Sequence, residues 1–389
     1  MSHPSVPEPV PGGAVLFDHD PAIANLNHGS VGSVPVPVRQ RRRLITDELE
    51  RDPRGFFKAR VERVTAARHA VAGLVGADPE LTAFVTNMTT GAAVVLNSLD
   101  LAAGDEVITT DHGYGAIGYN VDAHVARTGV VRKIAEIPLT PTDDEVVEAV
   151  LGQVTDRTRL AIVDHITSAT ARLFPIERLA RELRSRGVPL LVDAAHVPGH
   201  IPADVTALGA DFWVGNLHKW AFAPRGTALL TVAPEWKDRI RPLVASWQHE
   251  SGYPVAVEYN GTDDYTNWLA SPFGVELLHD LGFERVSDHN RRLAHYGQSV
   301  LAKALNVEVP DPGLSDLAMR LVMLPPGVGD TDEKAAVIED AVRRQLGVEL
   351  TVNAFGGQGT MRIAAQVHNR SAQYESLADR LPALLHSLG

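Results

Sequence analysis

The sequence contains no cysteine among its 389 residues. The chain therefore has no disulfide bond, no thiolate zinc site, no iron–sulfur cluster and no cysteine nucleophile. Long apolar runs are also missing, because no stretch of about 18 apolar residues occurs. The proline-rich start, MSHPSVPEPVPGG, has neither the basic start nor the apolar run of a signal peptide. We therefore expect a cytoplasmic protein that does not associate with a membrane.

Positive charge is scarce, since 36 Lys and Arg residues stand against 48 Asp and Glu residues and the formal net charge is −12. The longest basic run is Arg41–Arg43, which is typical of the solvated face of a helix. A negative chain repels a phosphate backbone, so nucleic acid is not an expected partner. The glycine-rich signatures of P-loop and dinucleotide sites are missing as well.

What the chain does contain is an alternation of short β-branched runs with helix-like stretches. The strand-like runs are Leu81–Thr86, Glu106–Thr110, Val130–Ile137, Leu160–Val163, Pro189–Val192, Asp211–Val214 and Thr227–Val232. The helix-like stretches between them are Ala92–Leu99, Ala116–Arg127, Asp144–Gln153 and Ile176–Arg186. This alternation predicts an α/β fold with crossover connections and a mostly parallel seven-stranded sheet covered on both faces.

The pattern changes from about Thr266 onward, where long helices and a few strands predict a smaller α+β domain. We divide the chain into three parts: residues 1–45 form an N-terminal arm and part of the small domain, residues 46–265 the large domain, and residues 266–389 the small C-terminal domain. The first 13 residues, rich in proline and glycine, are expected to form a loose arm.

Ligands of parallel sheets bind beyond the carboxyl ends of the strands, so polar residues at those ends are the first candidates for a site. Asp193 ends a wholly apolar strand, where an unpaired buried carboxylate is costly. A helix N-cap explains it about equally well. Lys219 follows the next strand, and by itself it reads as a solvated loop lysine. One helix and one strand separate the two residues, so both can reach one pocket.

This pairing matches the chemistry of an aldehyde cofactor. A lysine amine forms a Schiff base with an aldehyde, and burial of the amine favours its neutral, nucleophilic form. A carboxylate beside a pyridine nitrogen keeps that nitrogen protonated and makes the ring an electron sink. Asp193 and Lys219 together therefore predict a pyridoxal 5′-phosphate site.

Further strand ends offer groups for the rest of such a cofactor. Thr89 and Thr90 lie in a hydroxyl-rich turn before a helix, which suits a phosphate and equally suits a helix cap. His112 and Tyr114 carry flat side chains that can stack on a ring. Near the C-terminus Arg362 lies inside a strand, where it can bind a carboxylate through two hydrogen bonds or form an internal salt bridge.

In order and spacing these motifs resemble fold type I, class V pyridoxal-phosphate enzymes, and within them the isopenicillin N epimerase-like branch. The resemblance runs from Leu26–Gly32 to Arg362, which is nearly the whole chain. It implies that Asp193 binds the pyridine nitrogen, that His196 lies near the ring hydroxyl, and that Lys219 carries the cofactor.

The resemblance also assigns the remaining site residues. It implies phosphate contacts for Thr89, Thr90, Asn216 and His218, with Thr262 reaching the phosphate of a neighbouring subunit. A homodimer with active sites at the interface follows from it. Tyr114 is favoured over His112 as the cover of the ring. It also implies that Asn27, His28 and Ser168 contact the substrate and that Arg362 binds the α-carboxylate of the substrate.

As a hypothesis, the substrate amine displaces Lys219 to form an external aldimine, and the freed lysine removes the Cα proton of an amino acid. The carbanion can then lead to epimerisation, to C–S cleavage or to transamination, and the residues leave this open. The isopenicillin N epimerase-like branch favours secondary-metabolite biosynthesis on a cysteine-derived substrate. Persulfide chemistry, as in cysteine desulfurases, is excluded because cysteine is missing.

Three other functions remain open from the sequence. A class V aminotransferase is one of them. A metal-dependent hydrolase using His112, His196, His218 and Asp193 is another, although no regular ligand spacing occurs and we expect no metal. The third is a cofactor-free binding or regulatory protein on the same fold, because fold alone does not define function.

Overall fold

The computed structural model describes residues 4–311, 313 and 315–388. The chain forms two compact units. The smaller unit contains the described residues as far as Val36, the short segment Ala169–Ala171, and the chain from Leu277 onward. The larger unit contains Pro37–Ser168 and Arg172–Glu276. Residues 1–3 of the predicted N-terminal arm lie outside the described residues.

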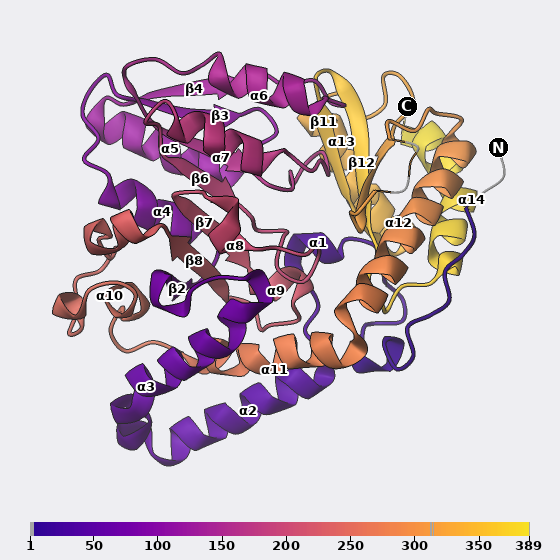
Figure 1. Ribbon diagram of the computed structural model, residues 1–389. Coiled ribbons are helices and arrows are strands. Elements are labelled where there is room, and N and C mark those ends of the chain that lie inside the picture. The colour runs from indigo at the N-terminus through magenta and orange to yellow at the C-terminus, as the bar shows by residue number, and fades with distance from the viewer. Residues whose placement is uncertain (1–3, 312, 314, 389) are drawn as a thin grey trace. The chain divides into compact units, whose positions relative to one another are not determined.

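The larger unit is built on a seven-stranded sheet with the order β2-β8-β7-β6-β5-β3-β4, which can be followed from β4 at the top to β2 in Figure 1. Its strands are β2 (Thr82–Val85), β3 (Glu106–Thr110), β4 (Val131–Ala135), β5 (Thr158–Asp164), β6 (Leu190–Asp193), β7 (Phe212–Asn216) and β8 (Ala228–Val232). Strand β8 runs antiparallel to both of its neighbours, and the other pairs are parallel. The carboxyl ends of β3, β5, β6 and β7 therefore lie at one edge of the sheet.

Helices cover both faces of this sheet. They are α4 (Met88–Ser98), α5 (Gly115–Thr128), α6 (Asp143–Leu151), α7 (Ile176–Arg184) and two single turns, α8 (Val205–Leu208) and α9 (Leu217–Trp220). Helices α4 and α5 contact each other on one face, and α6 and α7 pair on the other. Burial on both faces explains why the inner strands β6, β7 and β8 are buried along their whole length, whereas the edge strand β4 carries Arg132 and Lys133 and is partly exposed.

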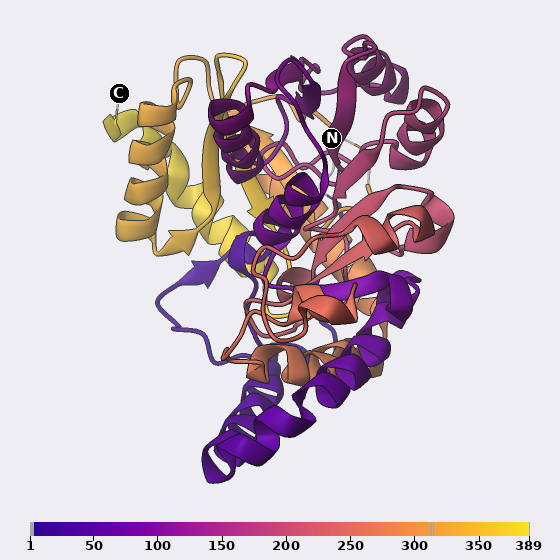
Figure 2. The ribbon, with the colours of Figure 1, turned by 90° about the vertical axis from the view of Figure 1, so that its left-hand side faces the viewer.

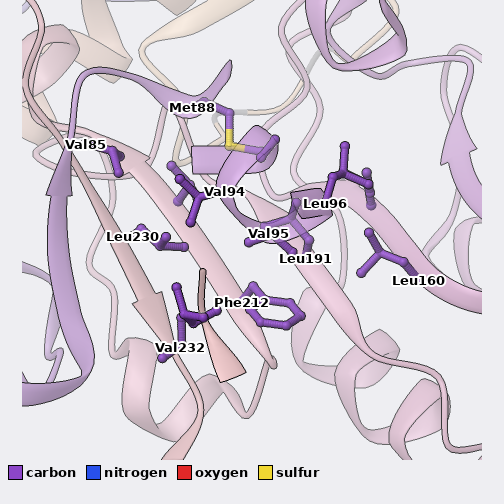
Figure 3. Packing of buried hydrophobic residues seen from close by; sticks show 14 of the residues in the cluster. Val85, Met88, Val94, Val95, Leu96, Leu160, Leu191, Phe212, Leu230 and Val232 are labelled. Atoms are coloured by element: carbon purple, nitrogen blue, oxygen red, sulfur yellow. The ribbon is translucent and has the colours of Figure 1, made fainter. Parts of the chain in front are cut away.

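The core between α4 and the sheet is closely packed. Figure 3 shows Val95 and Leu96 of the helix facing Leu191 and Phe212 of the strands, and each of these side chains is at most 1% exposed. Complete burial of such a side chain contributes about 1.5–3 kcal/mol. This packing fixes the start of α4 relative to the strand ends that carry the site.

The larger unit also contains α3 (Pro53–Ala72), α10 (Val255–Glu258) and most of α2 (Val36–Arg51) and α11 (Thr266–Leu281). Helices α2 and α3 lie side by side, as Figures 1 and 2 both show. Helix α3 carries Arg68, whose Nε lies 3.0 Å from Glu258 Oε1 with both side chains buried. Glu258 also accepts a hydrogen bond from the backbone N–H of Phe84, which lies in the middle of β2. This buried ion pair joins α3, α10 and the edge of the sheet.

The smaller unit has a three-stranded antiparallel sheet and a two-stranded parallel one. Its strands are β1 (Ala24–Asn25), β9 (Met319–Met323), β10 (Val348–Glu349), β11 (Thr351–Phe355) and β12 (Gln358–Ala364). Its helices are α1 (His28–Val31), α12 (Phe283–Leu305), α13 (Asp332–Ala341) and α14 (Ser371–Leu388). The described part of the arm packs on this unit, because Val10 is buried and the Glu8 carbonyl lies 2.8 Å from His289 Nδ1.

The predicted fold class is confirmed, with a mostly parallel seven-stranded sheet and a smaller α+β unit. Strands β10 and β11 follow each other closely in the chain and separate at Leu350. Helices α8, α9 and α10 were not predicted, because a single turn of four residues is too short to show helical periodicity. Among the described residues no helix is long and apolar enough to cross a membrane.

Candidate active site

Two carboxyl groups lie side by side at the carboxyl edge of the large sheet. Asp164 ends β5 and Asp193 ends β6, and the two residues are Cα partners in the parallel ladder. Both side chains are nearly completely buried. Strands lie about 4.8 Å apart and partnered side chains point to the same face, so the two carboxyl groups are close neighbours.

Asp193 has one satisfied and one unsatisfied oxygen. Its Oδ1 accepts the backbone N–H of Ala195 at 3.0 Å. Within the described part of the chain, its buried Oδ2 has no hydrogen-bond partner. Burial raises the pKa of Asp193 to about 6, while the Ala195 N–H and the charge of Lys219 act in the opposite direction. The helix N-cap interpretation is wrong, because a turn follows Asp193 and the next helix begins at Val205.

Lys219 lies on α9, the single helical turn that follows β7. It is half-buried, and its Nζ lies 3.1 Å from Nε2 of His196. The other ring nitrogen of His196, Nδ1, lies 3.4 Å from the indole Nε1 of Trp220. Trp220 is fully buried and stacks on His200. Lys219 is therefore held in a half-buried contact and is not a solvated loop residue.

The contact with Trp220 indicates the tautomer of His196. An indole N–H only donates, so His196 Nδ1 must accept, and the neutral ring carries its proton on Nε2, which faces Lys219. Burial raises the pKa of Asp193 and of Asp164, and the positive charge of Lys219 in turn acts to lower them.

The ends of β7 and β8 organise the residues before Lys219. The side-chain oxygen of Asn216 accepts the backbone N–H of Met88 at 2.9 Å, which ties the end of β7 to the start of α4. His218 Nδ1 lies 2.8 Å from the carbonyl of Thr227. Burial lowers the pKa of His218 to about 4, so the ring is neutral at physiological pH.

The predicted phosphate turn lies at the N-terminus of α4, an eleven-residue helix. Asn87 is its N-cap and accepts the backbone N–H of Thr90 at 2.9 Å. The cap function that the sequence left open for the threonines therefore belongs to Asn87. Thr89 and Thr90 are half-buried in the first turn, and the hydroxyl of Thr90 lies 2.7 Å from that of Thr86.

The turn after β3 holds the two candidate ring covers in different surroundings. His112 is fully buried, its Nε2 lies 3.1 Å from the carbonyl of Ile137, and its ring packs edge-on against Phe174. Burial lowers its pKa. Tyr114 is 48% exposed and directly precedes α5. The remaining predicted residues of this unit, Ser168 and Thr262, are half-buried and exposed respectively.

The smaller unit brings three of the predicted substrate-side residues together. Arg362, on β12, donates through Nη2 to Asn27 Oδ1 at 2.8 Å and to Thr351 Oγ1 at 3.3 Å. Asn27 is the residue before α1, whose first residue, His28, is fully buried and contacts His368. Burial lowers the pKa of Arg362 to about 10, and the nearby charge of Glu339 opposes this shift. The guanidinium is thus held in a defined orientation.

Comparison with known proteins then identifies the family. The family model "Aminotransferase class-V" matches residues 54–377, a range that contains Asp193, Lys219 and Arg362. The chain belongs to the aminotransferase class-V family. Enzymes of the aminotransferase class-V family use pyridoxal 5′-phosphate, so the chain is a pyridoxal-phosphate enzyme.

Similar proteins with known names indicate the branch of the family that the chain resembles. The chain is 32% identical to isopenicillin N epimerase of Amycolatopsis lactamdurans and 30% identical to that of Streptomyces clavuligerus, in both cases over 94% of this chain and 96% of the relative. It is 28% identical to L-cysteine desulfhydrase of Arabidopsis thaliana, over 94% of this chain and 89% of that one. The predicted isopenicillin N epimerase-like resemblance is therefore confirmed.

Solved structures share the fold of this chain. The cystine C–S lyase C-DES in complex with cysteine persulfide matches with a TM-score of 0.78 at 20% identity, over 92% of this chain and 97% of that one. The cysteine desulfurase CsdA of Escherichia coli matches with a TM-score of 0.78 at 18% identity, over 99% of this chain and all of the other.

The class-V cofactor fits the unsatisfied atoms of the larger unit. Among the described residues, three buried oxygen atoms near the strand ends have no hydrogen-bond partner: Asp193 Oδ2, Thr110 Oγ1 and Thr227 Oγ1. A buried polar atom without a partner costs about 1–3 kcal/mol. A pyridine N–H would satisfy the carboxylate oxygen, and the amine of Lys219 suits an aldehyde. The residues present therefore fit pyridoxal 5′-phosphate.

Asp164 and Thr110 were not predicted as site residues, although both lie at strand ends. Asp164 carries the same signal that selected Asp193, a carboxylate that ends an apolar strand. Asp164 becomes a candidate site residue because β5 lies next to β6, and this strand order is known only from the folded sheet.

Proposed function

We propose that this chain removes the Cα proton of a cysteine-derived amino acid and then cleaves its C–S bond. The observation that carries the proposal is the contact between Lys219 Nζ and His196 Nε2, at 3.1 Å, on the strand edge that also holds Asp193. A β-elimination needs one base near Cα, and Lys219 with His196 forms such a base.

The bound cofactor supplies an aldehyde that captures the substrate amine and a ring that accepts electrons from Cα. Asp193 keeps the ring electron-poor, because its Oδ2 accepts the pyridine N–H and, above its raised pKa of about 6, carries the opposite charge. Lys219 anchors the aldehyde and takes up the Cα proton. His196 positions the amine through Nε2, and Trp220 fixes the tautomer that does so.

The phosphate lies, in this proposal, at the start of α4. Backbone N–H groups of the first turn and the hydroxyls of Thr89 and Thr90 suit an anion there. Asn216 holds the turn through Met88, and we place the neutral ring of His218 next to the phosphate as well. Thr262 is exposed, as a residue that reaches the phosphate of a second subunit must be. The proposal therefore includes a homodimer with active sites at the interface.

The remaining residues contact the cofactor ring or the substrate. Tyr114 covers the ring, since His112 already bonds the Ile137 carbonyl. Arg362 holds the α-carboxylate, with Asn27 keeping the guanidinium in place and His28 behind it. Ser168 contacts the substrate. Two parallel hydrogen bonds from a guanidinium fix a carboxylate in orientation as well as position.

Epimerisation is the second candidate, favoured by the identity of 30–32% to two isopenicillin N epimerases over nearly the full chain. In that case the proton returns to Cα from the other face. In either case we place the reaction in secondary metabolism. The chain has no cysteine, so it cannot hold a persulfide as a desulfurase does.

The first experiment tests the covalent link. The purified protein should show a visible absorbance band, and borohydride followed by peptide mapping should place the cofactor on Lys219. Lys219→Ala should abolish trapping, while Lys237→Ala, a lysine outside the site, should not change it. A colourless wild-type protein that chelators inactivate would instead favour a metal hydrolase using His112, His196 and His218. A colourless protein without any activity would favour a binding protein.

The second experiment separates the reactions. The holoenzyme is incubated in D₂O with L-cysteine, with S-alkyl cysteines and with amino acids that lack a β-leaving group. Pyruvate with a released thiol supports the lyase. Deuterium at Cα with inverted configuration supports the epimerase, and a 2-oxo acid with the amine form of the cofactor supports the aminotransferase. If none of these substrates yields pyruvate or acquires deuterium at Cα, the proposal is refuted.

A further inference from the structure

Arg60 of α3 is a buried cation to which the proposed reaction gives no function. Its side chain is 7% exposed. In the part of the chain that the structure describes, its guanidinium contacts aromatic rings and pairs with no carboxylate. A buried charge is costly unless other groups compensate for its lost hydration. A guanidinium is suited to aromatic faces because it is planar and weakly hydrated.

Three aromatic rings contact this guanidinium. Its Cζ lies 3.9 Å from the ring centroid of Tyr259, 5.4 Å from that of Tyr265 and 5.6 Å from that of Phe57. All three distances are within the range of about 6 Å over which a ring attracts a cation. Phe57 lies three residues before Arg60, so both side chains lie on one face of α3. The two tyrosines lie on either side of residues 260–264.

The loop of residues 260–264, between α10 and α11, therefore has both of its ends against one side chain. The hydroxyl of Tyr265 donates to the carbonyl of Gly261 at 3.1 Å. Gly261 has a φ of +107°, a conformation that residues with a side chain rarely adopt. Thr262 follows directly and is exposed. The backbone conformation that precedes Thr262 thus depends on the position of Tyr265.

A second contact reaches the end of the loop from α2. Arg42 Nη2 lies 3.2 Å from Asp264 Oδ2, and Asp264 Oδ1 accepts the backbone N–H of Thr266 at 2.9 Å. The two charged side chains are 43% and 51% exposed, and ion pairs that are exposed to this extent contribute little. The buried Arg60 is therefore the stronger of the two anchors.

We propose that Arg60 is a positioning residue, which holds the 260–264 loop through the rings of Tyr259 and Tyr265 and thereby places Thr262 for contact with the cofactor phosphate of a second subunit. The inference rests on the function proposed above, in which Thr262 reaches that phosphate. It assigns Arg60 no contact with the cofactor or the substrate. A loop that is held at both ends loses less conformational freedom when it binds a ligand, so its contact with the phosphate is stronger.

The first experiment measures the loop in the apoenzyme. Arg60→Met keeps an apolar side chain but has no charge for the rings to attract. Cleavage before Asp263 by an aspartate-specific endoprotease should be at least about tenfold faster in this variant than in the wild type, because loss of the cation–ring contacts favours opening of the loop. Arg60→Lys keeps a cation and should restore part of the protection. Equal cleavage rates in Arg60→Met and the wild type would overturn the proposal.

Arg63→Met is the matched control, because Arg63 lies on the same helix and also stacks on a ring. Its Cζ lies 4.5 Å from the ring centroid of Phe56, and its Nη1 lies 2.7 Å from Glu48 Oε1 on α2. Neither of these contacts involves the loop, so cleavage before Asp263 should stay at the wild-type rate. A rate as high as that of Arg60→Met would show that the effect is not specific to Arg60 and would overturn the proposal.

The second experiment asks whether the loop acts on the phosphate. Pyridoxal has the ring and the aldehyde of the cofactor but no phosphate. In spectroscopic titrations Arg60→Met should bind pyridoxal 5′-phosphate about tenfold more weakly than the wild type does, and should bind pyridoxal within about twofold of the wild type. Thr262→Ala should show the same pattern, and the double variant should bind no more weakly than either single variant, because both changes remove one contact. Losses that multiply in the double variant, or an equal loss of pyridoxal binding, would overturn the proposal.

Failure of this inference can be distinguished from failure of the proposed function. If borohydride traps no cofactor on Lys219, the proposed function fails, while cleavage before Asp263 still reports whether Arg60 holds the loop. If trapping succeeds but Thr262→Ala binds the cofactor as the wild type does, the positioning inference is wrong and the enzyme assignment stands. If urea titration shows that Arg60→Met does not fold, Tyr259→Leu removes the nearest ring from the side of the loop. Wild-type cleavage and wild-type cofactor affinity in that variant would overturn the inference in the same way.

Discussion

The substitution Asp193→Asn should have opposite effects on the free enzyme and on the cofactor-bound enzyme. Burial raises the pKa of Asp193 to about 6 in the folded chain, against about 3.9 for an unfolded aspartate. A difference of about 2 pH units corresponds to about 3 kcal/mol. Because the folded pKa is the higher one, this stability is present below about pH 4 and is lost as the pH rises through about 6.

Asparagine cannot ionise, so the variant does not lose this stability. Its amide oxygen can still accept the Ala195 N–H, while its NH₂ group takes the unpartnered position of Oδ2 at a cost of about 1–3 kcal/mol. The absolute stability of the variant therefore depends on two opposing contributions. The pH dependence of stability does not depend on these two contributions. We expect the free energy of unfolding of the variant apoenzyme, relative to that of the wild-type apoenzyme, to increase by about 2–3 kcal/mol between pH 4 and pH 7.

Urea unfolding of the apoenzymes across this range measures the difference. Asp238→Asn, at an exposed position of the same unit, is the control and should show no such trend. Addition of pyridoxal 5′-phosphate should reverse the order, because the ring N–H pairs with Asp193 and a bound ligand stabilises the form that binds it. Cα-proton exchange by the variant should fall by orders of magnitude. A difference that stays constant with pH would show that Asp193 is not desolvated, and would refute the reasoning.

Three further substitutions test other parts of the structure. Trp220→Phe keeps the stack on His200 but removes the donor to His196 Nδ1; kcat should fall about tenfold with a shifted pH profile and an unchanged KM, and an unchanged pH profile would contradict the tautomer assignment. Arg362→Lys keeps the charge but loses the planar fork, so KM for the amino acid should rise at least tenfold while cofactor affinity stays constant in a spectroscopic titration. Arg68→Met leaves Glu258 buried alone and should cost about 3–5 kcal/mol in urea unfolding. That cost should be largest above about pH 7, since burial raises the pKa of Glu258 to about 7 and below that pH the carboxylate takes up a proton.

Local patterns predicted the larger elements well because each long segment shows its own periodicity. The strand Glu106–Thr110 has the predicted bounds, and the helix predicted over Ala116–Arg127 is α5 with one more residue at each end. The single-turn helix α9 was not predicted, although it carries Lys219. Four residues are less than two helical turns, so no apolar spacing can show them.

Three interpretations that the sequence left open were decided by the folded chain. Whether Asp193 caps a helix was decided by the turn that follows it, and whether Lys219 is solvated was decided by His196, 23 residues away. For Thr89 and Thr90, Asn87 turned out to be the cap. In each case the residue type indicated a candidate for the site, but the residue that it contacts could not be predicted from the sequence.

By itself the sequence determined the class of fold, the strand ends that carry polar residues, and the exclusion of cysteine chemistry. These properties follow from composition and from local order along the chain. Only the tertiary structure decided that β5 lies next to β6, and therefore that Asp164 is the neighbour of Asp193. It alone placed His196 Nε2 against Lys219 and left Asp193 Oδ2 without a partner among the described residues. The reason is physical, because strand order, burial and hydrogen bonding across the sheet arise only when segments far apart in sequence pack together.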